Sequence, residues 1–323
     1  MATQPEDLKV DAPAVSIIIP TFNVQAYIEE TLQSVLTQTF VDFELIVIDD
    51  GSTDQTVDKV EQLALRDSRI RLMSNHRRKG VSGARNTGIG AATGQWICFL
   101  DGDDLLHESA LAERIKVSRQ HPDCCFFSGD YIRFWTGESK QGSSQSEENA
   151  YWRQMLRAGR TDPDKPVVLD EPVNLFMQAV LTWTGCVMIS ADLVKSLSGF
   201  NETLVTAEDD HLWMRVAARC RQMVFVPTSL TFYRQRPGSL TQSGNAIHEH
   251  AVAAYLNLMK DPGCSVHSEA LMSNIRSFIH QNTYHYRKTG VRAKALYWAM
   301  QGLRYDSANA TAWRNLAATL LLN

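Results

Sequence analysis

The sequence lacks the features that mark membrane-spanning and exported proteins. It has no run of about 18–20 apolar residues, so it predicts no transmembrane helix. Its first thirteen residues are polar and acidic, without the basic start and apolar centre of a signal peptide. We therefore expect a cytoplasmic protein, in which any membrane contact is peripheral and on the inner face.

Cysteine pairs and excess basic charge are also missing. None of the six cysteines stands in a C-x-x-C pair, which argues against a zinc site. Most of them lie in apolar stretches, and we interpret them as reduced core residues. The 32 Lys and Arg residues against 36 Asp and Glu give a net charge of −4, which disfavours binding to nucleic acid.

What the sequence does contain is an alternation of short apolar runs and helical patterns. The uninterrupted apolar runs predict buried strands at 15–20, 43–48, 70–73, 96–100, 125–130, 183–189 and 223–226. The helical patterns fall at 27–36, 53–65, 82–92, 110–120, 191–197 and 208–220. This order predicts an α/β domain with a mostly parallel sheet flanked by helices.

Two parts of the chain depart from that alternation. Residues 137–170 are polar and predict an insertion or mobile loop, with a helix near 151–156. After about residue 246 only helices are predicted, at 251–259, 269–286, 291–303 and 311–322. Arg292–Asn309 has the cadence of one tetratricopeptide-like hairpin. We expect a flexible N-terminus (1–13), an α/β domain (14–245) and a helical extension (246–323) that packs on the domain, the alternative being a partner or membrane surface.

Polar side chains stand where three of the predicted strands end. Thr21 and Asn23 follow the first strand, Asp50 the second, and Asp101 and Asp103 the fourth. In open α/β sheets the ligand lies outside the carboxyl ends of the strands. This convergence predicts a binding site at that edge.

Asp101 and Asp103 are separated by one glycine at the end of a strand. Two carboxylates spaced in this way on an extended segment point the same way and favour a shared Mg²⁺ or Mn²⁺ ion. Such an ion bridges to a diphosphate and neutralises the leaving group. The alternative is a plain polar turn with a helix cap.

Further acids have two interpretations each. Glu208 and Asp209 open a predicted helix, where acids favour the helix dipole, but a carboxylate there also suits a general base that takes a proton from a sugar hydroxyl. An aspartate of the Asp49–Asp54 turn would accept a uracil N–H or ribose hydroxyls, or the turn serves only to let Ser52 or Thr53 cap the next helix.

Three arginines complete the candidate site. Arg85 lies in a helix of small residues, from which a long cation is expected to extend towards the cleft. Arg234 and Arg236 follow the last strand, and guanidinium groups pair well with phosphate oxygens. The alternative for these two is a solvated loop charge.

Taken together, these blocks resemble glycosyltransferase family 2, which has the GT-A fold. The resemblance covers about residues 15–241. It rests on the order and spacing of VSIIIPTFN (15–23), DDGSTD (49–54), GARNTG (83–88), FLDGDD (99–104), GFNE (199–202) and Glu208-Asp209.

The resemblance implies a role for each matching position. Pro20, Thr21 and Asn23 lie against the nucleotide, Asp50 contacts uracil, and Arg85 is near the phosphates. Asp101 contacts the ribose, Asp103 is the metal ligand, Asp209 is the catalytic base with Glu208 beside it, and Arg234 belongs to a loop over the diphosphate. Trp183, Thr184 and Gly185 lie where relatives shape the sugar and acceptor pocket. In place of a histidine found in many relatives after Arg234, this chain has Gln235 and Arg236.

The sequence thus predicts an inverting, Mn²⁺- or Mg²⁺-dependent glycosyltransferase. It would move a sugar from a nucleotide donor, expected to be a UDP-sugar, to a carbohydrate, lipid-linked or protein acceptor. Two alternatives stay open: a non-catalytic glycan-binding or scaffold protein, and a nucleotidyltransferase. The second is disfavoured because residues 21–25 (TFNVQ) lack a glycine- and lysine-containing phosphate loop.

Overall fold

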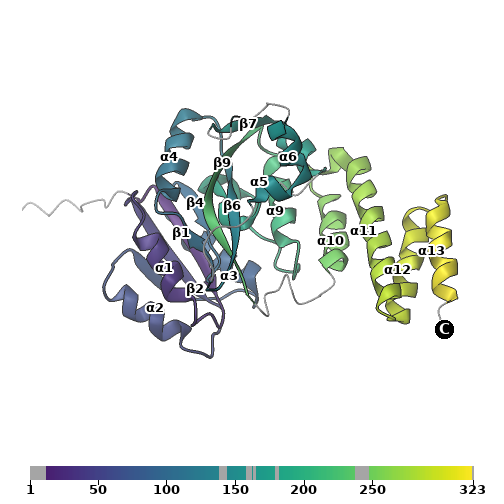
Figure 1. Ribbon diagram of the computed structural model, residues 1–323, viewed down its shortest axis with the longest axis horizontal. Helices are drawn as coiled ribbons and strands as arrows, with labels where there is room; N and C mark the ends of the chain where they lie inside the picture. Colours follow the sequence, from purple (N-terminus) through teal and green to yellow (C-terminus); the bar gives the residue numbers. More distant parts are fainter. Residues whose placement is uncertain are drawn as a thin grey trace, which may run out of the picture.

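The computed structural model describes residues 12–137, 144–157, 162, 165–178, 182–236 and 247–321. An α/β domain and a row of helices lie side by side along the long axis (Figure 1). The expected boundary at 245/246 and the expected flexible residues 1–11 fall outside the described residues, so the division into domains stays a prediction.

The first half of the domain is the predicted alternation. Strands β1 (Val15–Thr21), β2 (Phe43–Asp49), β3 (Ile70–Ser74) and β4 (Trp96–Phe99) pair in parallel, in the order β3-β2-β1-β4. Helices α1 (Ile28–Leu36), α2 (Thr56–Ala64) and α3 (Val81–Ala91) connect them. These elements agree with the predicted ranges to within one to three residues.

The start of α2 corrects the expected cap. Oδ1 of Asp54 accepts the N–H of Thr56 at 3.0 Å, so the helix begins at Thr56 rather than at Thr53. The hydroxyl of Ser52 instead accepts the N–H of Asn23 at 3.0 Å. The turn therefore links two loops rather than capping the helix with Ser52 or Thr53.

The second half of the sheet is mixed rather than parallel. Strand β8 (Met188–Ser190) is antiparallel to both β4 and β6 (Phe126–Trp135), while β9 (Gln222–Gln235) is parallel to β6. The short β5 (Leu105–Leu106) pairs with β9. Helices α4 (Ala110–Gln120), α7 (Pro172–Phe176), α8 (Ala191–Ser196) and α9 (Glu208–Ala217) complete the domain.

The strand predicted at 183–189 is wrong over its first half. Thr184–Cys186 forms a 3₁₀ turn, η1, and only Met188–Ser190 is a strand. The carbonyl of Gly185 accepts hydrogen bonds from Arg114 and from the Thr231 hydroxyl. Side chains therefore bond this carbonyl in place of the backbone of a neighbouring strand. An apolar sequence run cannot reveal such side-chain bonding.

The polar segment 137–170 contains more structure than a loop. Helices α5 (Gln145–Glu148) and α6 (Ala150–Arg157) confirm the helix expected near 151–156, and β7 (Val167–Asp170) extends the sheet antiparallel to β9. Trp152 is fully buried and stacks on Phe225 with ring centroids 3.8 Å apart. This aromatic anchor holds the described part of the insertion to the domain.

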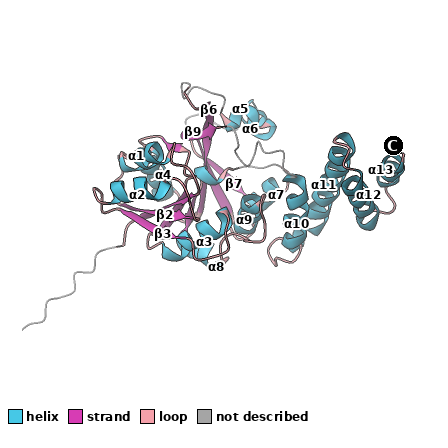
Figure 2. Cartoon of the chain, turned by 90° about the horizontal axis from the view of Figure 1, so that it is seen from below, coloured by secondary structure: helices cyan, strands magenta, loops and turns pink. Residues whose placement is uncertain are grey.

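Two apolar cores cover the two faces of the sheet. Helices α1, α2 and α4 lie on one face and α3, α8 and α9 on the other (Figure 2). The central strands are buried on both faces, which is why they read as continuous apolar runs.

The C-terminal helices are α10 (Ile247–Leu258), α11 (Ser268–Lys288), α12 (Arg292–Tyr305) and α13 (Ala310–Leu320), with a 3₁₀ turn, η3 (Ser265–His267), before α11. Helix α10 packs on α9, and the carboxylate of Asp261 accepts hydrogen bonds from Arg215 and Arg219 of the domain. Helices α12 and α13 lie farthest from the sheet (Figure 1). The expected packing on the domain thus holds for α10 and the adjoining loop. None of the helices in the described ranges is long and apolar enough to cross a membrane.

Candidate active site

The loops after β1 and β2 are joined by hydrogen bonds at the predicted edge. The N–H of Asp50 donates to the carbonyl of Thr21 at 2.9 Å, and the N–H of Thr53 donates to Oδ1 of Asn23 at 2.8 Å. Asn23 holds a left-handed backbone, with φ of 51°, that turns the chain out of β1. Pro20 and Thr21 are buried at the end of the strand, and the next two residues, Phe22 and Asn23, are exposed.

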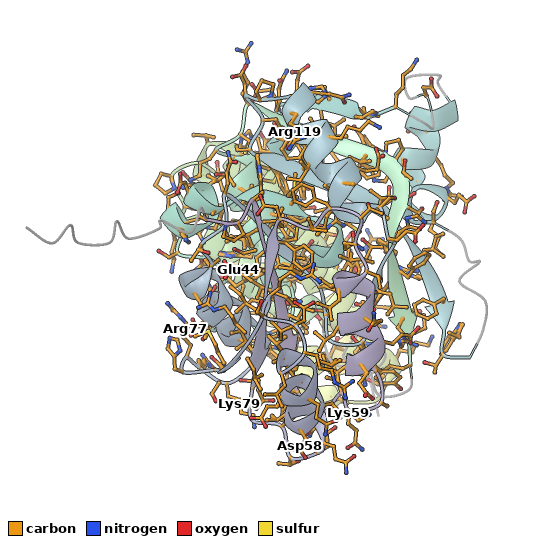
Figure 3. All side chains as sticks on the ribbon, turned by 90° about the vertical axis from the view of Figure 1, so that its left-hand side faces the viewer. Glu44, Asp58, Lys59, Arg77, Lys79 and Arg119 are labelled. Carbon is orange, nitrogen blue, oxygen red and sulfur yellow. The ribbon has the colours of Figure 1, made fainter. Side chains whose placement is uncertain are left out.

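Asp50 fixes the loop that precedes α3. Its carboxylate accepts from Asn75 Nδ2 at 2.6 Å and from the N–H of Gly80 at 2.8 Å. Lys79, on the same loop, places its ammonium group 4.7 Å from the ring of the half-exposed Phe22 (Figure 3). The basic run 75–80, which includes Lys79, could add phosphate contacts or be a solvated loop, whereas Phe22 is not predicted to be a site residue. Their pairing across two loops could not be seen in the sequence.

Arg85 corrects an expectation. Its side chain is only 4% exposed and does not extend into solvent. Instead it donates to Asp101 Oδ1 at 2.8 Å and to Glu208 Oε1 at 3.0 Å, and its guanidinium lies 5.2 Å from the ring centroid of Phe200. The small residues of α3 allow this helix to pack closely, which buries the arginine between two acidic loops. The structure thereby brings together the acids after β4 and at the start of α9.

Glu208 and Asp209 lie at the N-terminus of α9. Burial and the adjacent charge of Asp209 raise the pKa of Glu208 to about 7, although Arg85 opposes the shift. Asp209 is less buried, and its Oδ2 lies 3.5 Å from the hydroxyl of Thr184. The two acids therefore differ in kind: Glu208 is held in an internal ion pair, while Asp209 remains available to a ligand.

The segment after β4 gathers three carboxylates. Burial and the charge of Asp101 raise the pKa of Asp103, and burial together with Asp103 raises that of Asp104 well above its usual value. Within the part of the chain that the structure describes, Oδ2 of the buried Asp104 has no hydrogen-bond partner. Gly102, between Asp101 and Asp103, is closely surrounded, because a Cβ there would lie 3.1–3.3 Å from Val24, Thr21 and the carbonyl of Pro20 and these neighbours would have to shift. Asp104 was not predicted as a site residue.

Two arginines of β9 and its end meet this acidic turn. Arg234 is buried and donates to the carbonyl of Asp103 and to Glu30, both at 2.6 Å, so it is not a solvated loop charge. Its guanidinium lies 4.7 Å from the ring centroid of Phe134. Arg236 forms an ion pair with the carboxylate of Asp103. Both arginines that follow the last predicted strand thus reach the DGD turn.

An aromatic group lines the region between η1 and β9. Trp183 lies against Tyr233, with centroids 4.5 Å apart, and edge-on to Tyr131 at 5.4 Å. A Cβ on Gly185 would come within 2.4 Å of the Trp183 ring, so only glycine leaves room for the indole. Trp183 is partly exposed, and Thr184 connects it to Asp209. Tyr233 stands beside Arg234 in the segment that resembles the loop over the diphosphate, whereas Tyr131 has no distinguishing signal in the sequence.

No three His, Cys, Asp or Glu side chains in the described ranges form a preformed metal cluster. Asp101 and Asp103 nevertheless offer carboxylate oxygens, the ligands that Mg²⁺ and Mn²⁺ prefer. Burial, and after it the charge of Asp101, raises the pKa of Asp103, and a bound cation would favour the ionised form of this carboxyl. The donor set therefore fits a divalent ion that completes its coordination with phosphate oxygens and water.

Known proteins match this chain in sequence and in structure. The model for glycosyl transferase family 2 matches residues 16–173. EpsJ, an uncharacterized glycosyltransferase of Bacillus subtilis (strain 168), is 29% identical over 231 residues, or 71% of this chain and 63% of that protein. WfgD of Escherichia coli, a UDP-Glc:alpha-D-GlcNAc-diphosphoundecaprenol beta-1,3-glucosyltransferase, is 41% identical over 122 residues, or 38% of this chain and 47% of that protein.

Among solved structures, S. aureus TarS 1-349 in complex with UDP-GlcNAc is similar, with a TM-score of 0.67 over 95% of this chain and 88% of that chain. At 18% identity the likeness establishes the shared fold, which is of the GT-A type. The matches span less than two thirds of the two named relatives, 63% and 47% of their lengths. By its family-model match and by its glycosyltransferase relatives, the segment 16–173 of the chain belongs to glycosyl transferase family 2.

Proposed function

We propose that the protein is an inverting glycosyltransferase that moves a sugar from a UDP-sugar to a hydroxyl of a lipid-linked saccharide. The observation that carries the proposal is the junction at Arg85. One buried guanidinium joins Asp101, in the predicted donor-binding turn, to Glu208, next to the predicted base. Donor and acceptor chemistry therefore share one rigid centre.

The donor would lie across the loops after β1, β2 and β4. Asn23 and Asp50 stand where a uridine ring and ribose would bind, and Asp101 faces the same edge with its side chain 29% exposed. A divalent ion bound at Asp103 would supply charge neutralisation for the departing diphosphate. Arg236, now paired with Asp103, is near enough to turn to the diphosphate once its partner is engaged.

Asp209 is the group proposed to remove the acceptor proton. It lies at a helix N-terminus and is partly exposed, and among the described residues no arginine hydrogen-bonds to it in the way that Arg85 holds Glu208. A carboxylate within hydrogen-bond reach of a hydroxyl accelerates its attack by about 10²–10⁴-fold. A single displacement of this kind inverts the configuration at the anomeric carbon and forms no covalent sugar intermediate.

The acceptor assignment rests on the relatives and on the aromatic group. WfgD is named for a diphosphoundecaprenol-linked acceptor, and its matching segment covers 38% of this chain. Trp183 and Tyr233 present ring faces and edges beside Thr184 and Asp209, where a saccharide ring would stack. A lipid-linked acceptor places the enzyme at the cytoplasmic face of a membrane, in synthesis of a cell-surface polysaccharide or glycoconjugate.

The test is UDP release from a panel of UDP-sugars with Mn²⁺ and synthetic polyprenyl-diphosphate saccharides. The proposal is supported if UDP release requires the acceptor and one UDP-sugar is clearly preferred. The rate of release should also be at least about 100-fold lower in Asp103→Ala than in wild type. Asp58→Ala, at an exposed position of α2 labelled in Figure 3, is the matched control for loss of one carboxylate and should keep full activity. If calorimetry detects binding of neither UDP nor any UDP-sugar, the proposed function is refuted. Binding without turnover would favour the non-catalytic alternative.

A further inference from the structure

Cys125 and Cys220 lie in contact although they are 95 positions apart in the sequence. Their sulfur atoms are 3.1 Å apart and share a hydrogen bond. A disulfide requires a sulfur separation of about 2.05 Å, so closure needs a movement of only about 1 Å. Cys125 directly precedes β6, and Cys220 lies between α9 and β9.

The pair is chemically unlike the other cysteines. The hydrogen bond from Cys220 lowers the pKa of Cys125 to about 7, and the same bond raises that of Cys220. Burial raises the thiol pKa of Cys98, Cys124, Cys186 and Cys264. Cys125 is also partly exposed, whereas those four are buried. Cys125 therefore combines partial exposure with a lowered thiol pKa, and Cys220 is already in place as its resolving partner.

The location of the pair separates it from the candidate active site. Strands β6 and β9 run parallel, and both cysteines precede these strands, while Arg234 and Arg236 stand at the far end of β9. In Figure 3, Arg119 near the end of α4 and Lys79 on the loop that precedes α3 lie at opposite ends of the domain. Cys220 nonetheless anchors the distal end of α9, the helix that begins with Glu208.

We propose that Cys125 and Cys220 form a reversible disulfide that fixes the far end of α9 to the start of β6. The Cys125 thiolate attacks the peroxide oxygen to give a sulfenic acid, and the Cys220 thiol then attacks that sulfur and releases water. In sum, two thiols and one hydrogen peroxide give one disulfide and two waters. A thiol reductant reverses the bond, as expected of a disulfide in a reducing compartment.

The cross-link should stabilise the protein without changing the reaction. Because it closes a long loop, the melting temperature should rise by roughly 5 °C or more. Because the bond forms at the sheet edge opposite the site, kcat with the best donor should change less than about twofold.

The experiment treats the full-length protein with stoichiometric hydrogen peroxide, then counts thiols after denaturation and maps peptides. Wild type should fall from six thiols to four, become about 2 Da lighter, yield a Cys125–Cys220 peptide, and recover with dithiothreitol. Cys125→Ser and Cys220→Ser should block the cross-link, while Cys124→Ser, the adjacent thiol, should retain it. The peptide map of wild type decides even if a variant folds poorly. Six remaining thiols, a cross-link through Cys124, or oxidation of Cys125 without a cross-link would each overturn the proposal.

Discussion

Replacing Arg85 with methionine tests whether this residue joins the acidic groups of the site. Methionine has a similar length but no charge, so the substitution leaves Asp101 and Glu208 without the positive charge that lies between them. Breaking a buried ion pair by removing one partner costs about 3–5 kcal/mol. Arg85 and Glu208 form the buried pair, with side chains 4% and 11% exposed and a distance of 3.0 Å, whereas Asp101 at 2.8 Å is 29% exposed and contributes less.

The loss of stability in Arg85→Met should be larger at high pH than at low pH. The pKa of Glu208 is already raised to about 7 by burial and by Asp209, and it rises further once the Arg85 charge is gone. Below that pKa Glu208 is neutral and needs no partner, so the variant should lose about half as much stability near pH 5.5 as near pH 8. Urea unfolding followed by tryptophan fluorescence at both pH values measures this difference.

Two control variants sharpen the Arg85 test. Arg85→Lys keeps the charge but not the fork, and should fall between wild type and Arg85→Met. Arg114 is equally buried but donates to the neutral oxygens of Gly185 and Thr231, so Arg114→Met should cost stability without the pH dependence. A loss under about 1 kcal/mol at pH 8, or the same loss at both pH values, would contradict the ion-pair reasoning.

Three further predictions concern the acids of α9 and its contact with the tail. Asp209→Asn should lower kcat by about 10²–10⁴-fold with UDP affinity within about twofold, measured by UDP release and calorimetry; a wild-type rate would exclude Asp209 as the base. Glu208 has a folded-state pKa raised from 4.5 to about 7, so stability present below pH 4.5 is lost as the pH rises through 7. In thermal scans, the melting temperature of Glu208→Gln should therefore fall less between pH 4.5 and 7 than that of wild type. An equal fall in both proteins would argue against the raised pKa of Glu208. Burial raises the pKa of Asp261, but hydrogen bonds from Arg219 and Arg215 outweigh it and lower the value to about 2. Its stabilisation is thus present above pH 3.8 and lost as the pH falls towards 2. Asp261→Asn should cost about 1–3 kcal/mol at neutral pH in urea unfolding and expose α10 to proteolysis, whereas wild-type resistance would show that this contact does not hold the tail.

Much of the first half of the fold was predictable because its signals are local. Continuous apolar runs such as Val15–Pro20 identify strands buried on both faces, and polar residues at their ends identify the ligand edge. The mixed second half was not predictable in the same way. The length of β9, the pairing of β7, and the turn at Thr184–Cys186 depend on partners distant in the sequence.

The candidate site also has a part that was predictable from the sequence and a part that was not. The sequence by itself determined which side chains are candidates for the site, since Asp101, Asp103 and Asp209 are marked by their spacing and by their places at strand and helix ends. Only the tertiary structure decided how these groups are connected: it buried Arg85 between Asp101 and Glu208, and it placed Arg236 on Asp103. The physical reason is that the charge state and orientation of a side chain depend on burial and on its partners. Those partners come from elements up to 133 positions away, which local patterns cannot report.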